Sequence, residues 1–366
     1  MKCVKLLILA QIPPPYLGQA MMNMEFINNL PSNLAYVHLK MQMSKDSEDF
    51  GRMSLSKLYS LFKLHIKLFW ILMFSKVEYV YFQPSGPVNV KTIIKDFPTI
   101  LLLKIFRKKI IYHFHADRFS RLLSEKSNFK SFIFQKIYSS PYSVIVILPH
   151  QKVDLFWLNP KKFYLLPNGL EDKYSLNYLV PRGNNHFVLL YVGLLVSYKG
   201  IKDIILIASI LKERGIIFKV DLIGGWSSLD FEREIKLLVK TLNLNDFVTF
   251  HGPKVETEKW KFFANSDILI HPSYEDLMPL SFIEGMMFGL PILTTDLEPF
   301  KYLVKDNKNG FLIKKGNLNM FVDKLIHLYD NSEVLKQMSK FSREEFLRNY
   351  SIDIFRKNLN EIIEDL

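Results

Sequence analysis

The chain has 366 residues, 49% of them hydrophobic, which is enough apolar material for two cores and suits two domains better than one. Its single cysteine, Cys3, excludes an intrachain disulfide and a cysteine-rich metal site, so a cytosolic setting is the default expectation. The formal net charge is +12, and the excess is local: residues 51–150 hold 16 Lys and Arg but 4 Asp and Glu, which bears on partners rather than on fold.

The first apolar run, Leu6–Ala10, follows two lysines and superficially resembles the core of a signal peptide. It is short, prolines follow it directly, and no small-residue cleavage site is present, so we expect a buried strand there. No stretch of 18 uncharged apolar residues occurs, and no transmembrane helix is expected.

Short apolar runs alternate with helical-period segments along the whole chain. In the first half they predict strands at residues 5–10, 35–39, 77–82, 109–114, 143–149 and 163–167. In the second half they predict strands at residues 187–193, 218–224, 247–252, 267–273 and 291–295, with a helical tail from about Asn319. Apolar strands separated by helices are typical of parallel sheets covered on both faces, so the predicted fold class is α/β with two Rossmann-like, doubly wound domains.

A polar interruption at residues 171–186, EDKYSLNYLVPRGNNH, contains Pro and Gly and is interpreted as the linker. It separates an N-terminal domain, residues 1–170, from a C-terminal domain, residues 187–345. Two such domains would face a central cleft, and ligands of open α/β sheets bind at the carboxyl ends of the strands. Residues directly after a strand are therefore the candidate site residues.

The stretch HPSYEDLMPLSFIEGMMFGLPILTTD, residues 271–296, follows one of these strands. It predicts a helix that begins near Pro279 and is capped by Gly289. The N–H groups of Leu280 and Ser281 then lie at the positive end of the helix dipole, which suits a diphosphate. Glu284, one turn further, is placed to accept hydrogen bonds from a ribose diol. Spacing alone favours a simpler interpretation, in which the early acids only complement the helix N-terminus.

Four other loops follow predicted strands. Lys199 in VGLLVSYKG could neutralise phosphate, although a loop lysine is more often only solvated. His113 or His115 in HFHAD would lie at a strand end, although a lone histidine is more often structural. Gly18 in PPPYLGQ would let a ligand approach the backbone, and Asn168-Gly169 needs no function beyond a turn.

Other chemistries find little support in the sequence. GxGxxG, Walker A and GxSxG motifs are absent, as is His/Cys metal spacing. No Asp-x-Asp pair is present to hold a divalent cation on a nucleotide-sugar. If a diphosphate is bound, Lys199 and the helix amides must therefore do this work, and the activity is expected to be metal-independent and without a cofactor.

Over essentially its whole length the chain resembles the retaining, family-4 glycosyltransferases of the GT-B fold. The specific match is residues 271–296, against a family pattern of Pro-Ser-x-x-Glu-Gly, then Glu-Ala, then Gly-x-Pro-Val. Supporting matches occur in the expected order, at PPPYLGQ, HFHAD, LPNGLED, YVGLLVSYKG, DLIGG, FHG and NGFLI.

The resemblance implies roles for the acids and the lysine. Glu284 would bind the donor ribose, and the first acid of the pair would contact the transferred sugar. Seven residues separate Asp276 from Glu284, as in the family, whereas eight separate Glu275 from it, so Asp276 is favoured and Glu275 stays open. Lys199 would contact the diphosphate, but Leu194 stands where the family often has an arginine.

The same resemblance assigns family positions to further residues. His115 matches the family's histidine at the cleft, and Gly18 matches its glycine loop beside the donor. Gly193 matches the glycine of the turn that an arginine often follows, and Gly224 together with the loop at Lys254 and Val255 matches the region near the base. The C-terminal helix, residues 346–366, would pack back on the first domain.

The implied function is retaining transfer of a sugar from a nucleotide-diphosphate sugar to a saccharide acceptor. We expect a lipid-linked acceptor in bacterial envelope polysaccharide synthesis, such as capsule or O-antigen. The basic, aromatic segments 55–76 and 104–114 predict contact with anionic lipid, so the protein would be cytoplasmic and peripheral on the inner membrane face. The alternative for 55–76 is a core helix with a solvated lysine edge.

No nucleic-acid-binding module is recognisable, so nucleic acid is not an expected partner. Two other functions stay open. One is a nucleotide-sugar epimerase, which shares the GT-B fold. The other is a degenerate, non-catalytic scaffold, which Leu194 and the aspartate at position 276 would permit.

Overall fold

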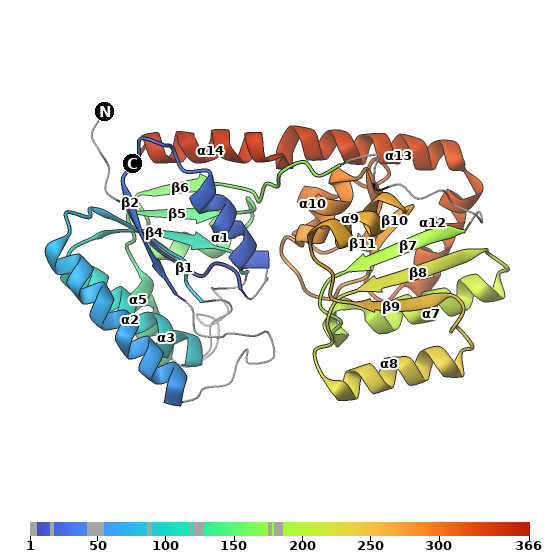
Figure 1. The fold of residues 1–366 in the computed structure, drawn as a ribbon, viewed down its shortest axis with the longest axis horizontal. Helices are drawn as coiled ribbons and strands as arrows, with labels where there is room; N and C mark the ends of the chain where they lie inside the picture. Colours follow the sequence, from blue (N-terminus) through green and yellow to red (C-terminus); the bar gives the residue numbers. More distant parts are fainter. Residues whose placement is uncertain are drawn as a thin grey trace. The chain divides into compact units, whose positions relative to one another are not determined.

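The computed structural model describes residues 6–14, 18–41, 55–85, 90–117, 119, 128–174, 178 and 186–366 (Figure 1). It divides into two compact units. Unit 1 comprises Met1–Gly169 and Asp353–Leu366, and unit 2 comprises Leu170–Ile352. Most of the predicted linker, residues 171–186, lies outside the described residues.

Unit 1 is built on a six-stranded parallel sheet with the strand order β2-β1-β3-β4-β5-β6. The strands are β1 (Leu6–Ala10), β2 (Tyr36–Lys40), β3 (Tyr79–Phe82), β4 (Lys109–Phe114), β5 (Ser143–Val146) and β6 (Lys162–Leu165). All six were predicted from the apolar runs. The central strands are almost wholly buried because helices cover both faces of the sheet, as their continuous apolar sequence requires.

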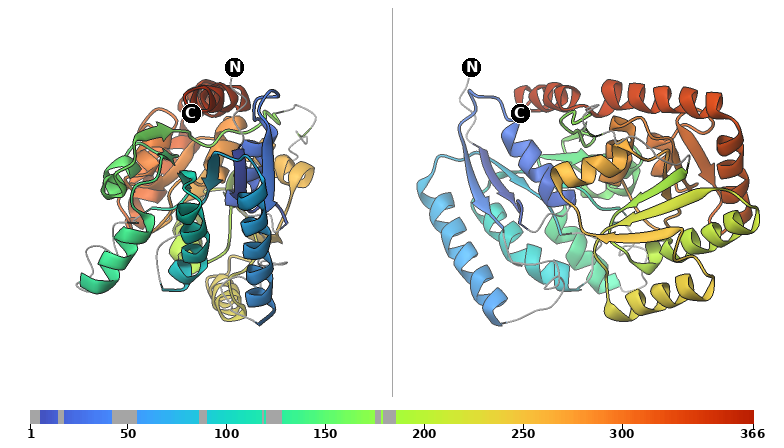
Figure 2. Two further views of the ribbon diagram at one scale, coloured as in Figure 1. Left: turned by 90° about the vertical axis from the view of Figure 1, so that its left-hand side faces the viewer. Right: turned by 45° about the vertical axis from the view of Figure 1, so that its right-hand side comes forward.

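Helices connect the strands of unit 1. They are α1 (Gly18–Asn28), α2 (Leu55–Phe74), α3 (Val90–Ile105), α5 (Asn128–Tyr138), α6 (Gln151–Asp154), the 3-10 turn η2 (Phe156–Leu158) and the C-terminal α14 (Ile352–Glu364). Helices α2, α3 and α5 lie side by side (Figures 1 and 2). The end of the chain is fixed to unit 1, because Lys162 Nζ lies 2.6 Å from Asp365 Oδ1 and Arg356 Nε donates to Asn29 at 3.1 Å.

The segment 104–114 is not a continuous surface patch. Residues 110–114 are buried in β4, at the centre of the sheet, so the prediction that they contact a membrane is wrong. The bases beside them are also engaged within unit 1. Lys108 Nζ donates to the Val77 carbonyl at 2.7 Å, and Lys109 Nζ lies 2.6 Å from Glu78 Oε1.

Unit 2 holds a second six-stranded parallel sheet with the order β12-β11-β10-β7-β8-β9. Its strands are β7 (Phe187–Val192), β8 (Phe218–Ile223), β9 (Val248–Gly252), β10 (Ile268–His271), β11 (Ile292–Thr295) and β12 (Gly310–Ile313). Strand β12 was not predicted, because its apolar run, Phe311–Ile313, stands between the polar segments 305–309 and 314–317. The chain reverses its direction of winding between β7 and β10, which therefore form the topological switch point of this sheet.

The helices of unit 2 lie between these strands and, from α12 on, after the last of them. They are η4 (Ser197–Lys199, 3-10), α7 (Ile201–Glu213), α8 (Leu229–Thr241), α9 (Glu256–Ala264), α10 (Leu280–Met287), α11 (Phe300–Leu303), α12 (Leu318–Asp330), α13 (Ser332–Glu345) and the π-helical turn η5 (Phe346–Tyr350). Helix α10 begins after Pro279, and Gly289 follows it with φ +73°, so both predicted boundaries are confirmed.

The chain passes between the units twice, and the two crossing points are hydrogen-bonded to each other. The N–H of Leu170 donates to the Tyr350 carbonyl at 2.9 Å, and the N–H of Ile352 donates back to the Leu170 carbonyl at 2.8 Å. Leu170 also pairs with Ser351 as an isolated parallel bridge. The returning helix was predicted from residue 346, whereas residues 346–350 form η5 of unit 2 and α14 begins at Ile352.

Candidate active site

Two loops leave the carboxyl edge of the second sheet at its switch point. One follows β7 and carries Lys199, and the other follows β10 and carries Glu275 and Asp276. In open α/β sheets this is the position at which ligands bind. The topology alone therefore brings together residues that are far apart in the sequence.

The two loops are held in close contact. Gly200 adopts φ +74°, and a Cβ atom there would lie 2.1 Å from the Pro272 carbonyl oxygen. The N–H of Tyr274 donates to the Tyr198 carbonyl at 2.8 Å. Only glycine combines this backbone conformation with so close an approach, so the Lys-Gly pair fixes the position of Lys199 beside the β10 loop.

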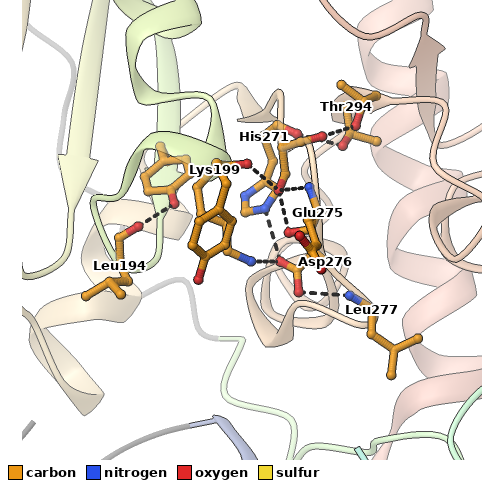
Figure 3. Close-up of polar contacts among 11 residues, drawn as sticks. Leu194, Lys199, His271, Glu275, Asp276, Leu277 and Thr294 are labelled. Carbon is orange, nitrogen blue, oxygen red and sulfur yellow. Dashed lines mark hydrogen bonds and ion pairs between the residues drawn. The ribbon is translucent and has the colours of Figure 1, made fainter. Parts of the chain in front are cut away.

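Asp276 lies between two nitrogen-bearing side chains (Figure 3). Lys199 forms an ion pair with its Oδ2, and His271 Nε2 lies 3.4 Å from the same oxygen. Its Oδ1 accepts a hydrogen bond from the N–H of Leu277 at 2.9 Å. Burial by itself raises the pKa of Asp276, but His271 and Lys199 outweigh it and lower the pKa to about 2. The carboxylate is therefore ionised at neutral pH.

His271 is the last residue of β10 and was not singled out from the sequence. It is buried, its ring stacks on Tyr191 at a centroid distance of 5.3 Å, and its carbonyl accepts a hydrogen bond from Thr294 at 2.7 Å. Burial lowers the pKa of His271, and the charge of Lys199 lowers it further against the opposing effect of Asp276. The ring is therefore neutral at neutral pH, and its Nε2 faces the Asp276 carboxylate.

The neighbouring acid, Glu275, has different surroundings. Its side chain is exposed, and its backbone is held by Ser273, whose hydroxyl donates to the Glu275 carbonyl at 3.0 Å. The pairing with Lys199 is made by Asp276. Of the two adjacent acids, Asp276 is therefore the one that contacts Lys199.

Helix α10 carries the other predicted donor contacts. Leu280 and Ser281 form its first turn, and their N–H groups have no hydrogen-bond acceptor among the described residues. Glu284 lies one turn further and is 6% exposed. Its Oε1 lies 2.5 Å from Nζ of Lys259, a residue of α9 that the sequence did not point to.

Glycines end the adjacent strands β7 and β8. Gly193 and Gly224 approach so closely that a Cβ atom on Gly224 would lie 1.8 Å from the Gly193 carbonyl oxygen. Leu194 follows, half exposed, and its carbonyl accepts a hydrogen bond from the Tyr191 hydroxyl at 3.0 Å. Position 194 thus carries a leucine where the resemblance leads one to expect an arginine.

The loop after β9 contains the last predicted contacts of unit 2. Lys254 Nζ lies 3.6 Å from Glu258 Oε2, and the exposed Val255 directly precedes α9. This loop therefore leads into the helix that carries Lys259.

Gly18 and His115 belong to unit 1. Gly18 is exposed and begins α1, as predicted. His115 follows β4, and its ring centroid lies 4.1 Å from that of His113. Burial lowers the pKa of His115 to about 4, so its ring is neutral at neutral pH. His113 Nδ1 and the Tyr81 hydroxyl are hydrogen-bonded at 2.7 Å, which makes His113 part of a buried network.

Within the described part of the chain, no three His, Cys, Asp or Glu side chains are grouped so that they could hold a metal ion. In the same residues, no helix is both long and apolar enough to cross a membrane.

Comparisons with known proteins show what the chain is similar to. Residues 180–345 match the family model described as glycosyl transferases group 1. An uncharacterized glycosyltransferase of Haemophilus influenzae is 33% identical over 178 residues, which are 48% of this chain and 48% of that protein. The capsular polysaccharide biosynthesis glycosyltransferase CapM of Staphylococcus aureus is 25% identical over 202 residues, 55% of this chain and 51% of CapM. The matched region thus spans about half the length of these curated relatives.

Solved structures resemble the chain over its full length. The crystal structure of Anabaena HepE in complex with UDP and glucose matches with a TM-score of 0.74 at 15% identity, covering 99% of this chain and 100% of HepE. At this identity the likeness concerns the fold alone. The two six-stranded parallel sheets with their helices are the GT-B fold, as predicted.

Proposed function

We propose that this chain is a glycosyltransferase that moves a sugar from a nucleotide-diphosphate sugar to a saccharide acceptor. The premise is the match of residues 180–345 to glycosyl transferases group 1 on a GT-B fold. The observation that carries the proposal is the Lys199–Asp276 ion pair at the switch point of the second sheet. It supports a site in which a cation and an anion have fixed positions beside the start of a helix.

In this proposal the donor's diphosphate binds Lys199 and the N–H groups of Leu280 and Ser281. Negative charge accumulates on the diphosphate as the sugar leaves, and preorganised charges and dipoles stabilise that charge more than they stabilise the ground state. Asp276 lies beside Lys199, where it would contact the hydroxyls of the transferred sugar. Glu284 would accept hydrogen bonds from the ribose diol.

We further propose that the anomeric configuration is retained and that neither Asp276 nor Glu284 acts as a nucleophile. Both carboxylates are paired with lysines, Asp276 with Lys199 and Glu284 with Lys259, which supports a role in gripping the donor. The proposed activity needs no metal ion. Turnover that is unchanged by a chelator would support this, whereas turnover restored only by Mg²⁺ or Mn²⁺ would contradict it.

The acceptor is proposed to be a lipid-linked saccharide used in bacterial envelope polysaccharide. The similarity to CapM, whose name places it in capsular polysaccharide biosynthesis, supports the polysaccharide part. In the resemblance, the first domain binds the acceptor, and His115 of unit 1 matches the family's histidine at the cleft. A neutral His115 would serve there as a hydrogen-bond partner rather than as a cation.

Helix α2 supports the proposed contact with an anionic membrane. Its inner face packs into unit 1 through Leu68 and Leu72, while its outer face is apolar and aromatic rather than polar. The outer residues are Tyr59 (59% exposed), Phe62 (63%), Ile66 (42%), Phe69 (36%), Trp70 (54%), Met73 (49%) and Phe74 (72%). Lys63 lies among them, with its Nζ 4.7 Å from the Tyr59 ring centroid.

An apolar face of this kind, with lysines beside it, is typical of helices that lie in the interface of an anionic bilayer. The alternative of a core helix with only a solvated lysine edge does not account for the exposed aromatic side chains. We therefore place the protein, in this proposal, on the inner face of the bacterial membrane.

The test of the function is a thermal-shift screen of UDP-, GDP- and ADP-sugars on the wild type and on Glu284→Ala. The expected result is stabilisation by one donor that is lost in the variant. Equal stabilisation of both proteins would count against Glu284 as the ribose ligand. Stabilisation by none of the donors would favour a non-catalytic scaffold, and donor conversion without an acceptor would favour an epimerase.

A further inference from the structure

Lys259 is the one charged partner of Glu284 among the described residues. Its Nζ lies 2.5 Å from Glu284 Oε1, and the two side chains are 19% and 8% exposed. The residues are 25 positions apart and come from different helices, α9 and α10. A carboxylate so well shielded from water requires a compensating charge, and Lys259 supplies it.

Aromatic packing fixes the position of the lysine. The Lys259 ammonium lies 4.4 Å from the centroid of the Trp260 ring. Trp260 in turn stacks on Phe288, the residue that ends α10, with centroids 5.8 Å apart and an interplanar angle of 21°. The contact between α9 and α10 therefore orients both members of the ion pair, and the lysine is not a freely moving surface side chain.

We propose that Lys259 is a positioning residue for the ribose of the donor. It holds Oε1 of Glu284 and so sets the carboxylate plane, which leaves Oε2 to accept hydrogen bonds from the ribose diol. The inference rests on the proposed function, because it assigns the ribose to Glu284. It adds a residue that neither the sequence motif nor the comparisons point to.

The experiment is calorimetric titration with UDP, GDP and ADP, followed by the 2′-deoxy and 3′-deoxy forms of whichever one binds the wild type. The wild type is expected to prefer the ribonucleotide. Lys259→Met is expected to weaken ribonucleotide binding by about 30-fold, equivalent to about 2 kcal/mol, while the deoxy forms lose much less. Lys259→Arg, which keeps the charge, is expected to recover most of the preference. In turnover, KM for the donor should rise and kcat should stay within about threefold.

Two further variants separate positioning from general destabilisation. Lys236→Met is the matched control, since Lys236 forms an ion pair with Glu232 at 2.6 Å on the exposed face of α8. It should bind like the wild type. Adding Lys259→Met to Glu284→Gln should cause no further loss of ribonucleotide binding. This double variant also leaves no unpaired charge, so it stays informative if Lys259→Met folds poorly.

The outcomes are distinguishable. Lys259→Met that binds ribonucleotide and deoxy forms with wild-type preference would overturn the inference and leave the proposed function intact. A further large loss on adding Lys259→Met to Glu284→Gln would also overturn it, because the lysine would then act independently of Glu284. If the wild type binds none of the three diphosphates, the proposed function fails and the inference fails with it.

Discussion

Lys199 and Asp276 form an ion pair although 77 positions separate them in the sequence. The parallel sheet accounts for the meeting, because β7 and β10 are neighbours and their carboxyl ends lie at the same edge. Before a donor binds, the charge of Lys199, the residue proposed to bind the diphosphate, is thus already neutralised by Asp276. A diphosphate must compete with Asp276 for Lys199, or share it.

The first prediction distinguishes the two adjacent acids. Asp276→Asn removes the charge that faces Lys199 and His271, and we expect kcat to fall by about 100-fold. Glu275→Gln removes an exposed carboxylate, and we expect a much smaller loss. Turnover is measured as release of the nucleoside diphosphate from the donor that stabilises the wild type. A larger loss in Glu275→Gln than in Asp276→Asn would make Glu275 the first acid.

The second prediction concerns the approach of the two site loops. Gly200→Ala places a methyl group against the Pro272 carbonyl in a left-handed backbone conformation, and we expect it to lower the free energy of unfolding by about 3 kcal/mol. Gly215→Ala is the matched control, because Gly215 has φ +73° but no atom within 4 Å of the added Cβ. Gly215→Ala has the cost of the left-handed backbone conformation but no steric clash, so we expect it to lower the free energy of unfolding by about 1 kcal/mol. Urea unfolding that gives equal losses would refute the close approach.

The third prediction is a pH dependence of stability in unit 1. The pKa of His115 is about 4 in the folded protein, below its ordinary value of 6.5, because burial disfavours the charged ring. Between these values the unfolded chain binds more protons, so the free energy of unfolding falls as the pH drops from about 6.5 to 4. We expect His115 to contribute about 2 kcal/mol of this loss.

His115→Gln should therefore reduce the slope of unfolding free energy against pH in that window. His327→Gln, which changes an exposed histidine of α12, serves as the control for a histidine-to-glutamine substitution. His113 and His271, whose pKa values burial also lowers, remain in the variant and contribute to the residual slope. An unaltered slope in His115→Gln would show that this ring is protonated normally in the folded protein.

The fourth prediction tests the exposed face of α2. Trp70 and Phe74 stack on each other at 5.2 Å and are largely exposed, so changing both to Ser should abolish most binding to vesicles that contain anionic lipid. Phe156→Ser is the control, since Phe156 is 76% exposed in unit 1 but lies outside α2. Co-sedimentation measures the effect. Equal binding of the wild type to neutral and anionic vesicles would contradict the proposed surface.

The strands and the helix boundaries of the site were predictable because local signals determine them. Continuous apolar runs identified all six strands of unit 1, and Pro279 and Gly289 identified the ends of α10. Strand β12 was missed because its apolar run, Phe311–Ile313, stands between two polar segments. The placement of Lys199 in a loop at the carboxyl edge of the sheet was predictable, since ligands of open α/β sheets bind after the strands at the switch point.

The partners of the site residues were not predictable in the same way. Lys259 pairs with Glu284 through the packing of α9 against α10, and no local pattern records which helices will touch. His271 is the last residue of an apolar strand, and the sequence gives no sign of its role. Its stacking on Tyr191 and its contact with Asp276 are seen only in the folded structure. Likewise, the sequence of α2 is amphipathic in appearance, but which of its aromatic side chains stay exposed depends on where α3 covers it.

The two hydrogen-bonded crossings at Leu170 and Ile352 have a consequence for synthesis on the ribosome. Unit 2 lies wholly within residues 170–352, as an insertion whose ends meet, whereas unit 1 needs residues 353–366 to be complete. Unit 2 is therefore synthesised in full before α14, which packs on unit 1, has been translated. Synthesis from the N-terminus thus delays the completion of unit 1 until after that of unit 2.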